Sequence, residues 1–194
     1  MPDTARDIAK RLGKSYVVRA VTVVHGESDD YAWATNTQEV PIDGTDGMLG
    51  MLVLAISDLR TLLRTADVAA AMSVEAQLAT DRVFAADLQA LRPHPGQAAS
   101  AANLVRILAD SGVVASHRGP DCNRVQDAYS LRCSPQVHGA ARDTVDHAAT
   151  VAERELASAV DNPVVVDGRL ESNGKLHGAP VAYVLAPCTA AAGP

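Results

Sequence analysis

The chain has 194 residues, 47% of them hydrophobic, and a formal net charge of −6. This length is enough for one domain with a sizeable core, and an acidic balance without a concentrated basic stripe argues against nucleic acid as a partner. Aromatic residues make up only 3% of the chain, so a core has to be filled by Ala, Val, Leu and Met, which favours packed helices over a β-sandwich. The composition predicts a mainly α protein.

The first 42 residues differ from the remainder of the chain. Residues 3–13 favour a short amphipathic helix, residues 15–24 have the β-branched density of a strand, and the polar residues 25–43 show no periodicity. The start carries no apolar stretch typical of a signal peptide, and the longest apolar run, residues 51–56, is too short to cross a bilayer. We therefore expect a soluble, cytoplasmic chain.

From residue 46 onward, apolar residues recur with the period of a helix. The pattern predicts helices over 48–63, 68–78 and 84–91. Another helix is predicted to begin at Pro95 and to be capped by Gly112, because proline suits the first turn of a helix and glycine suits its end. This part of the chain therefore reads as a series of packed helices.

The longest predicted helix begins at Ser134 and Pro135, a favourable pair for a helix start, and ends before Pro163. Its expected inward face consists of small and aliphatic residues: Val137, Ala141, Val145, Ala148, Ala152, Leu156 and Ala159. A small β-hairpin is predicted near 163–172, with Asp167 and Gly168 as its turn.

Several common site motifs find no support in this sequence. Three cysteines, Cys122, Cys133 and Cys188, without CxxC spacing favour reduced thiols over disulfides or a zinc site. Neither an HExxH pair nor a GxSxG segment occurs, and the glycines of 12–15 and 44–50 lack the spacing of a phosphate-binding or dinucleotide-binding loop. These patterns give no reason to expect a metal site or a nucleotide site.

Gln126, Tyr129 and Arg132 form a more promising group, because residues three apart in a helical turn place their side chains over one side. An arginine offers a forked, permanently charged donor that matches a carboxylate, and a phenol and an amide add hydrogen-bonding groups. The spacing alone leaves two interpretations open: a carboxylate-binding site, or a surface turn of solvated polar groups.

The sequence around Gln126, Tyr129 and Arg132 resembles that of a known family. The segments VQDAYSLRCSPQVHGAARD, ERELASAVDNPVV and ESNGKLHGAPVAY, and the upstream residues 44–104 in the same order, resemble the histidine ammonia-lyase family of the aromatic amino acid ammonia-lyases. The likeness covers about 42–185. It divides the chain into an N-terminal segment, 1–42, a partial lyase helical domain, 43–185, and a divergent tail, 186–194.

The resemblance implies a fold, an assembly and a reaction. The family fold is a bundle of long antiparallel helices of the fumarase/aspartase-like kind, assembled as a homotetramer with active sites built from more than one subunit. The family deaminates L-histidine to urocanate with a methylidene-imidazolone formed from an internal Ala-Ser-Gly. By match to its motifs, Gln126, Tyr129 and Arg132 are the expected catalytic residues, and Arg132 is expected to bind the substrate carboxylate.

The sequence also departs from the family pattern. Asp43 stands where the family has an asparagine that positions the cofactor. In the substrate-binding segment, where the family has Gly-Asn-Phe-His, this chain has Gly-Lys followed by Leu176 and His177, so a leucine replaces the phenylalanine. No Ala-Ser-Gly occurs, and the single Ser-Gly is preceded by Asp110. We therefore expect that this chain encodes no cofactor.

Two interpretations follow from these departures. The first is a truncated or frame-disrupted lyase product that does not deaminate L-histidine alone. The second is a noncatalytic helical interaction module that associates with a full-length lyase subunit and lends it Gln126, Tyr129 and Arg132. A residual carboxylate binder based on Arg132 is a weaker third. Because the helix at 48–59 is apolar almost all round, we also expect oligomers or aggregates.

Overall fold

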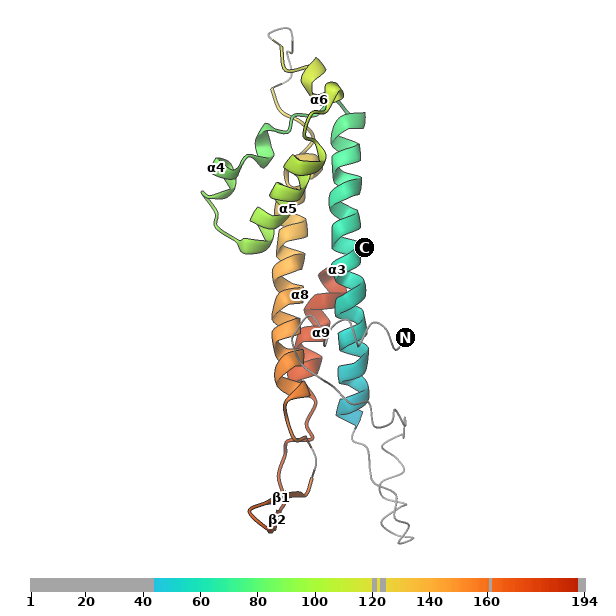
Figure 1. The fold of residues 1–194 in the computed structure, drawn as a ribbon, viewed down its shortest axis with the longest axis vertical. Coiled ribbons are helices and arrows are strands. Elements are labelled where there is room, and N and C mark those ends of the chain that lie inside the picture. Colours follow the sequence, from blue (N-terminus) through green and yellow to red (C-terminus); the bar gives the residue numbers. More distant parts are fainter. Residues whose placement is uncertain (1–43, 120–121, 123–124, 161, 192–194) are drawn as a thin grey trace. The chain divides into compact units, whose positions relative to one another are not determined.

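The computed structural model describes residues 44–119, 122, 125–160 and 162–191. The helix predicted at 3–13, the strand predicted at 15–24 and Asp43 lie outside these residues. The compact unit described below starts at Thr45 and is mainly helical, with one small antiparallel sheet (Figure 1). The predicted mainly α fold class with a small hairpin is confirmed.

Helix α3, Gly44–Ala76, is one continuous helix of 33 residues, whereas the apolar pattern predicted two. The two predicted helices are joined because Asp67 occupies a core position between Leu63 and Ala71 and is buried there with polar partners. A charged residue on an inward stripe looks like an interruption in sequence, but it continues the helix when its charge is matched.

Short elements follow α3. The helix predicted at 84–91 is only a 3₁₀ turn, η2 (Arg82–Phe84), and a single turn, α4 (Ala86–Gln89). Helix α5, Pro95–Ile107, begins at the predicted proline, but Gly112 does not cap it. Asp110 turns the chain in the left-handed conformation with φ of 60°, and Gly112 instead begins α6, Gly112–Ser116.

The longest helix after α3 is α8, Ser134–Leu156, preceded by the single turn α7, Tyr129–Arg132. Of the expected inward face of α8, Val145, Ala148 and Ala152 are buried, while Val137 and Leu156 are exposed. Val137 is exposed because the inward stripe continues toward the start of the helix through polar side chains, His138 and Arg142, that the hydrophobic pattern does not count. Leu156 is the last residue of α8.

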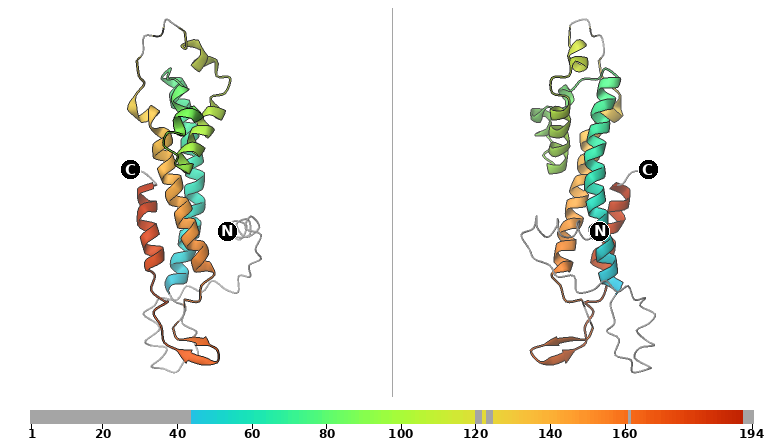
Figure 2. Two further views of the ribbon diagram at one scale, coloured as in Figure 1. Left: turned by 90° about the vertical axis from the view of Figure 1, so that its left-hand side faces the viewer. Right: turned by 45° about the vertical axis from the view of Figure 1, so that its right-hand side comes forward.

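Strands β1, Val164–Val166, and β2, Arg169–Glu171, form the predicted hairpin, in which Val164 pairs with Glu171. Asp167 and Gly168 have φ of 50° and 76°, the positive values that a tight two-residue turn requires. Helix α9, Ala179–Ala191, follows and packs along α8 (Figure 2).

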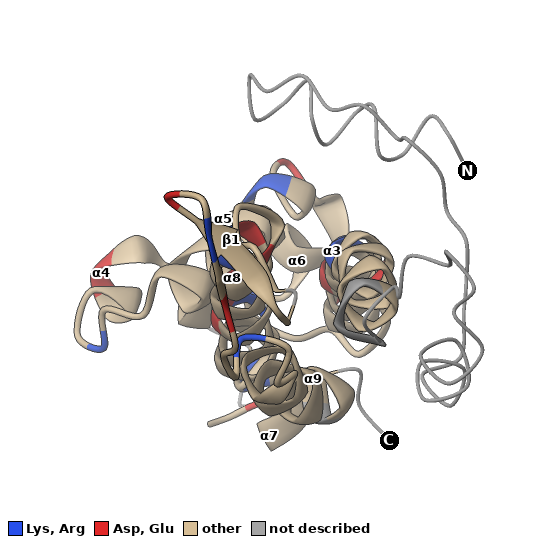
Figure 3. Ribbon diagram, turned by 90° about the horizontal axis from the view of Figure 1, so that it is seen from below, with Lys and Arg blue, Asp and Glu red and all other residues tan. Residues whose placement is uncertain are grey.

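The helices are long and antiparallel: α3 and α9 run opposite to α8 (Figure 1). Viewed along the helices, α8 lies between α5 and α9 (Figure 3). One core cluster joins α3, α8 and α9, and it consists of Leu49, Leu52, Ile56, Leu63, Val145, Ala148, Ala152, Val181, Val184 and Cys188. A second cluster lies between the far half of α3 and α5 to α7, and it consists of Ala71, Val74, Ala79, Phe84, Ala101, Leu104, Leu108, Val114 and Leu131.

Helices α5 and α8 approach closely at two glycines. A Cβ atom on Gly139 would lie 2.3 Å from the backbone of Gln97, and one on Gly96 would lie 2.2 Å from the carbonyl oxygen of Gly139. The amide of Gly96 also donates to the Asp143 carboxylate at 2.8 Å. This contact fixes the start of α5 against the first half of α8. None of the helices in the described part of the chain is long and apolar enough to span a membrane.

Candidate functional site

The predicted carboxylate-binding group lies at the α7 turn. Tyr129 and Arg132 are the first and last residues of α7, and the Arg132 guanidinium carbon lies 5.8 Å from the centre of the Tyr129 ring, within the range of a cation–π contact. Gln126 is exposed in the non-helical segment before α7, so the three side chains do not share one helical turn as expected. The structure therefore brings Tyr129 and Arg132 together and places Gln126 just upstream.

Arg132 is held by one edge of its guanidinium group. Its Nε donates to the carbonyl oxygen of Asp127 at 3.0 Å, and its two terminal nitrogens have no hydrogen-bond partner among the residues that the structure describes. Two parallel N–H donors on a planar fork match the two oxygens of a carboxylate. The geometry of Arg132 is therefore suited to binding a carboxylate end-on.

Tyr129 presents an exposed phenol beside this guanidinium, with 74% of the residue accessible. A hydrogen bond with the Cys133 thiol is the main cause that raises the pKa of Tyr129, and the neighbouring charge of Arg132 acts weakly in the opposite direction. The phenol is therefore protonated at neutral pH and can donate a hydrogen bond.

Leu176 and His177 come just before α9, which starts beside the last turns of α8, whereas Arg132 comes just before the first turn of α8 (Figure 1). Both are exposed, and His177 Nδ1 accepts a hydrogen bond from the Ala179 amide at 3.2 Å. The 23 residues of α8 span about 34 Å at the rise of an α-helix. A single copy of the chain therefore does not bring Leu176 and His177 to a ligand held by Arg132.

The serine of the single Ser-Gly pair has a structural task. The Ser111 hydroxyl donates to Glu75 at 2.5 Å and accepts from the Val114 amide at 3.1 Å, which caps α6. In the sequence it is preceded by Asp110 and followed by Gly112, so it is not part of an Ala-Ser-Gly segment. Within the described ranges, no cluster of three or more His, Cys, Asp or Glu side chains is placed to hold a metal ion.

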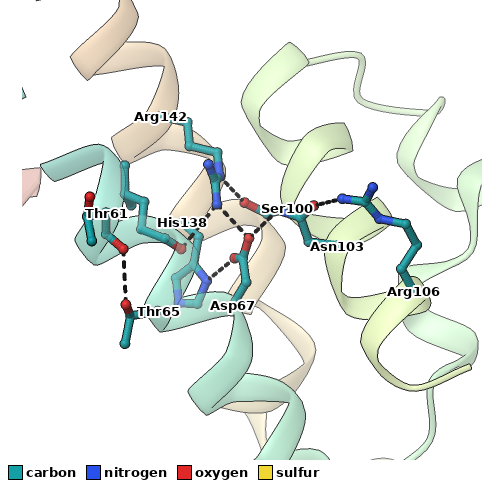
Figure 4. A network of polar contacts seen from close by, with 9 residues as sticks. Thr61, Thr65, Asp67, Ser100, Asn103, Arg106, His138 and Arg142 are labelled. Atoms are coloured by element: carbon teal, nitrogen blue, oxygen red, sulfur yellow. Dashed lines mark hydrogen bonds and ion pairs between the residues drawn. The ribbon is translucent and has the colours of Figure 1, made fainter. Parts of the chain in front are cut away.

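A buried polar network joins α3, α5 and α8 near the α7 turn (Figure 4). Asp67 is only 1% exposed. Its carboxylate accepts from His138 Nδ1 at 2.8 Å, from Arg142 Nη2 at 2.5 Å and from Asn103 Nδ2 at 2.6 Å. Arg142 also donates to the Ser100 hydroxyl at 2.8 Å and to the Leu63 carbonyl at 3.1 Å. This network locks the first turns of α8 to two neighbouring helices.

The network keeps Asp67 ionised. Burial, the largest influence, raises the pKa of Asp67, but the hydrogen bonds from His138 and Asn103 and the charge of Arg142 together outweigh it and lower the pKa below its ordinary value. The hydrophobic pattern of the sequence did not predict this network. A signal was present, since a lone aspartate on the apolar stripe of a helix requires buried cationic or hydrogen-bonding partners.

Comparison with known proteins identifies the family. Residues 41–192 match the sequence profile of the aromatic amino acid lyases, which is most of the chain.

The chain belongs to the aromatic amino acid lyase family.

The similar proteins include several named histidine ammonia-lyase. The chain is 66% identical over 145 residues to the one from Streptomyces griseus, an alignment that covers 74% of this chain and 28% of the relative. The crystal structure of histidine ammonia-lyase from Trypanosoma cruzi is similar with a TM-score of 0.66 and 30% identity, over 97% of this chain and 32% of that one. The expected resemblance to histidine ammonia-lyases is confirmed.

A second solved structure, tyrosine aminomutase from Streptomyces globisporus, matches with a TM-score of 0.69 and 29% identity, over 97% of this chain and 40% of that one. The expected ammonia-lyase helical bundle is therefore confirmed as the fold. The chain spans about 28% of the length of the Streptomyces histidine ammonia-lyases that it matches at 66% identity. The roles of Gln126, Tyr129, Arg132, Leu176 and His177 in this chain are predictions.

Proposed function

We propose that this chain supplies the carboxylate-binding segment of a lyase that removes ammonia from L-histidine to give urocanate. The observation that carries the proposal is the Arg132 fork, held at Nε by the Asp127 carbonyl and open at both terminal nitrogens within the described part of the chain. The high identity to relatives named histidine ammonia-lyase supports L-histidine as the substrate.

In this proposal each residue has a defined task. Arg132 pairs with the substrate carboxylate and fixes its orientation through two charge-assisted hydrogen bonds. Tyr129 offers a protonated phenol beside that carboxylate, and Gln126 adds an amide donor and acceptor. Leu176 and His177 contact the substrate at the other end of the site, where the leucine provides an aliphatic wall.

The proposed site lies between copies and not within one. Arg132 and His177 belong to opposite ends of α8, so they can line one site only if different subunits contribute them. The sequence also has no Ala-Ser-Gly, so we expect no deamination by this chain alone. We further propose a homotetrameric, cytoplasmic lyase as the assembly in which the segment works.

The alternative is a noncatalytic helical module that associates with a full-length lyase and lends it the α7 turn. The exposure of Gln126 and Tyr129 favours this second function, since exposed polar groups at a helix end can reach into a neighbour's site. Both candidates predict product only when this chain is mixed with a lyase subunit.

The test is a complementation assay that follows urocanate absorbance after addition of L-histidine. The chain is assayed alone and mixed with a full-length histidine ammonia-lyase in which the arginine matching Arg132 is replaced by alanine. Product only in the mixture supports a shared site, product from the chain alone overturns the expected dependence on a partner, and no product in either overturns the proposed function. In the mixture, Arg132→Ala should abolish product, while Arg154→Ala, an exposed arginine at the other end of α8, should not.

A further inference from the structure

Asp127 connects the α7 turn to the end of α3 through both its side chain and its backbone. Its Oδ2 accepts a hydrogen bond from the Thr80 amide at 2.8 Å, across 47 residues of sequence. Its carbonyl oxygen accepts from Arg132 Nε at 3.0 Å. One residue therefore contacts both the connector after α3 and the guanidinium group of the candidate site.

The connector that Asp127 contacts is itself fixed. Ala79 is 1% exposed within the second core cluster, and its amide donates to the Val74 carbonyl at 2.9 Å. The Ala79 carbonyl lies 3.1 Å from His117 Nε2. The Thr80 amide that binds Asp127 is therefore presented by a backbone segment held in the core.

We propose that Asp127 is a positioning residue for Arg132, an inference that rests on the proposed function of the α7 turn. The bond to Thr80 fixes the Asp127 backbone, and the Asp127 carbonyl then occupies the Nε edge of the guanidinium group. This contact leaves the end-on pair of terminal nitrogens for the substrate carboxylate and prevents a side-on arrangement that would use Nε. The chain thereby selects one of the two ways in which an arginine can bind a carboxylate.

Two variants separate this role from a general effect on folding. Asp127→Asn keeps an oxygen that can accept from the Thr80 amide, whereas Asp127→Ala removes the acceptor. The backbone carbonyl that binds Arg132 is present in both variants, so they change the side chain that accepts from Thr80 and leave the acceptor of Arg132 in place. Glu153→Ala, at an exposed acidic residue on α8, is the matched control.

The first readout is hydrogen exchange of the Arg132 Nε–H, followed by ¹⁵N NMR and assigned through its loss in Arg132→Lys. We expect exchange in Asp127→Ala to be at least about tenfold faster than in the original chain, as for a lost hydrogen bond of about 1.4 kcal/mol. Asp127→Asn and Glu153→Ala should exchange like the original. Unchanged exchange in Asp127→Ala overturns the proposal whether or not the chain supports catalysis.

The second readout is the complementation assay with L-histidine. Loss of orientation at Arg132 should raise KM about tenfold in Asp127→Ala. Inhibition by histamine, which lacks the carboxylate, should remain unchanged. Equal losses for both compounds would indicate a structural defect and overturn the positioning role. If the original chain fails to complement, the proposed function fails, and the exchange measurement alone decides whether Asp127 orients Arg132.

Discussion

The two ends of α8 carry residues with related expected tasks but are built differently. At the first end, the Arg132 turn and the start of α8 are tied to distant parts of the chain: Asp127 to Thr80 across 47 residues, and His138 to Asp67 across 71. At the other end, the hydrogen bonds of His177 in the described part of the chain are with near neighbours in sequence: its amide donates to the Gly174 carbonyl, and its Nδ1 accepts from the Ala179 amide. Long-range polar contacts therefore order one end, and local turns shape the other.

This difference indicates which part of the candidate site one copy can form by itself. A fixed guanidinium binds its ligand without losing conformational freedom on binding, so the Arg132 end is preorganised. The side chains of Leu176 and His177 and all three residues of β2 are exposed. Their geometry in a working site would depend on the surface of a neighbouring copy.

The largest effect is expected from removing the carboxylate that holds the first end of α8. Asp67→Ala leaves the partly buried Arg142 guanidinium without its anionic partner, which should lower the free energy of unfolding by about 3–5 kcal/mol. Urea unfolding followed by far-UV circular dichroism, at fixed protein concentration, measures the loss. The control, Asp146→Ala, breaks the exposed ion pair with Arg60 and should cost less than about 1 kcal/mol. Similar losses in the free energy of unfolding for Asp67→Ala and Asp146→Ala would contradict the claim that the buried polar network stabilises the first end of α8.

A smaller but still clear loss is expected where α5 crosses α8. Gly139→Ala places a methyl group 2.3 Å from the Gln97 backbone, so the helices must separate, at a cost of about 1–3 kcal/mol. The control is Gly174→Ala near the other end, where nothing lies within 4 Å of the added atom and the change should stay within about 0.5 kcal/mol. If Gly174→Ala lowered the urea midpoint more than Gly139→Ala, the expected difference in packing between the two ends would be contradicted.

The polar network should also make stability depend on pH. The pKa of Asp67 is lowered below its ordinary value of 3.8 in the folded chain. Its ionised form therefore contributes stability that is present above pH 3.8 and is lost as the pH falls through the still lower folded value. Only the proton-linked part of the network is removed in this way, so the effect should be smaller than that of Asp67→Ala.

A comparison between the original chain and Asp67→Asn isolates the stability that the charge of Asp67 contributes. The difference in their free energies of unfolding should be constant near neutral pH and should shrink as acid protonates Asp67, because a protonated carboxyl resembles the amide. A difference that stays constant through the acidic range would mean that the charge of Asp67 contributes nothing to the first end of α8.

The same contrast between local and long-range contacts explains how much of the structure could be predicted from sequence. The hairpin turn at Asp167 and Gly168 was predicted because its chemistry is local. The continuity of α3 was missed because Asp67 reads as polar until its partners 36 to 75 residues away are known. Tyr129 and Arg132 were found as a pair, but the role of Asp127 depends on Thr80, whose proximity no sequence period indicates.

The smallest effect concerns one titration at the α7 turn. The hydrogen bond with Cys133 is the main cause of the raised pKa of Tyr129, so Cys133→Ala should lower that pKa toward its ordinary value of 10.0. Ultraviolet absorbance of tyrosinate as the pH is increased measures the change, and subtraction of the same titration for Tyr129→Phe removes the other three tyrosines. Cys122→Ala, at an exposed thiol, is the control and should leave the titration unchanged. A higher or unaltered pKa of Tyr129 in Cys133→Ala would contradict the assigned contact with the Cys133 thiol.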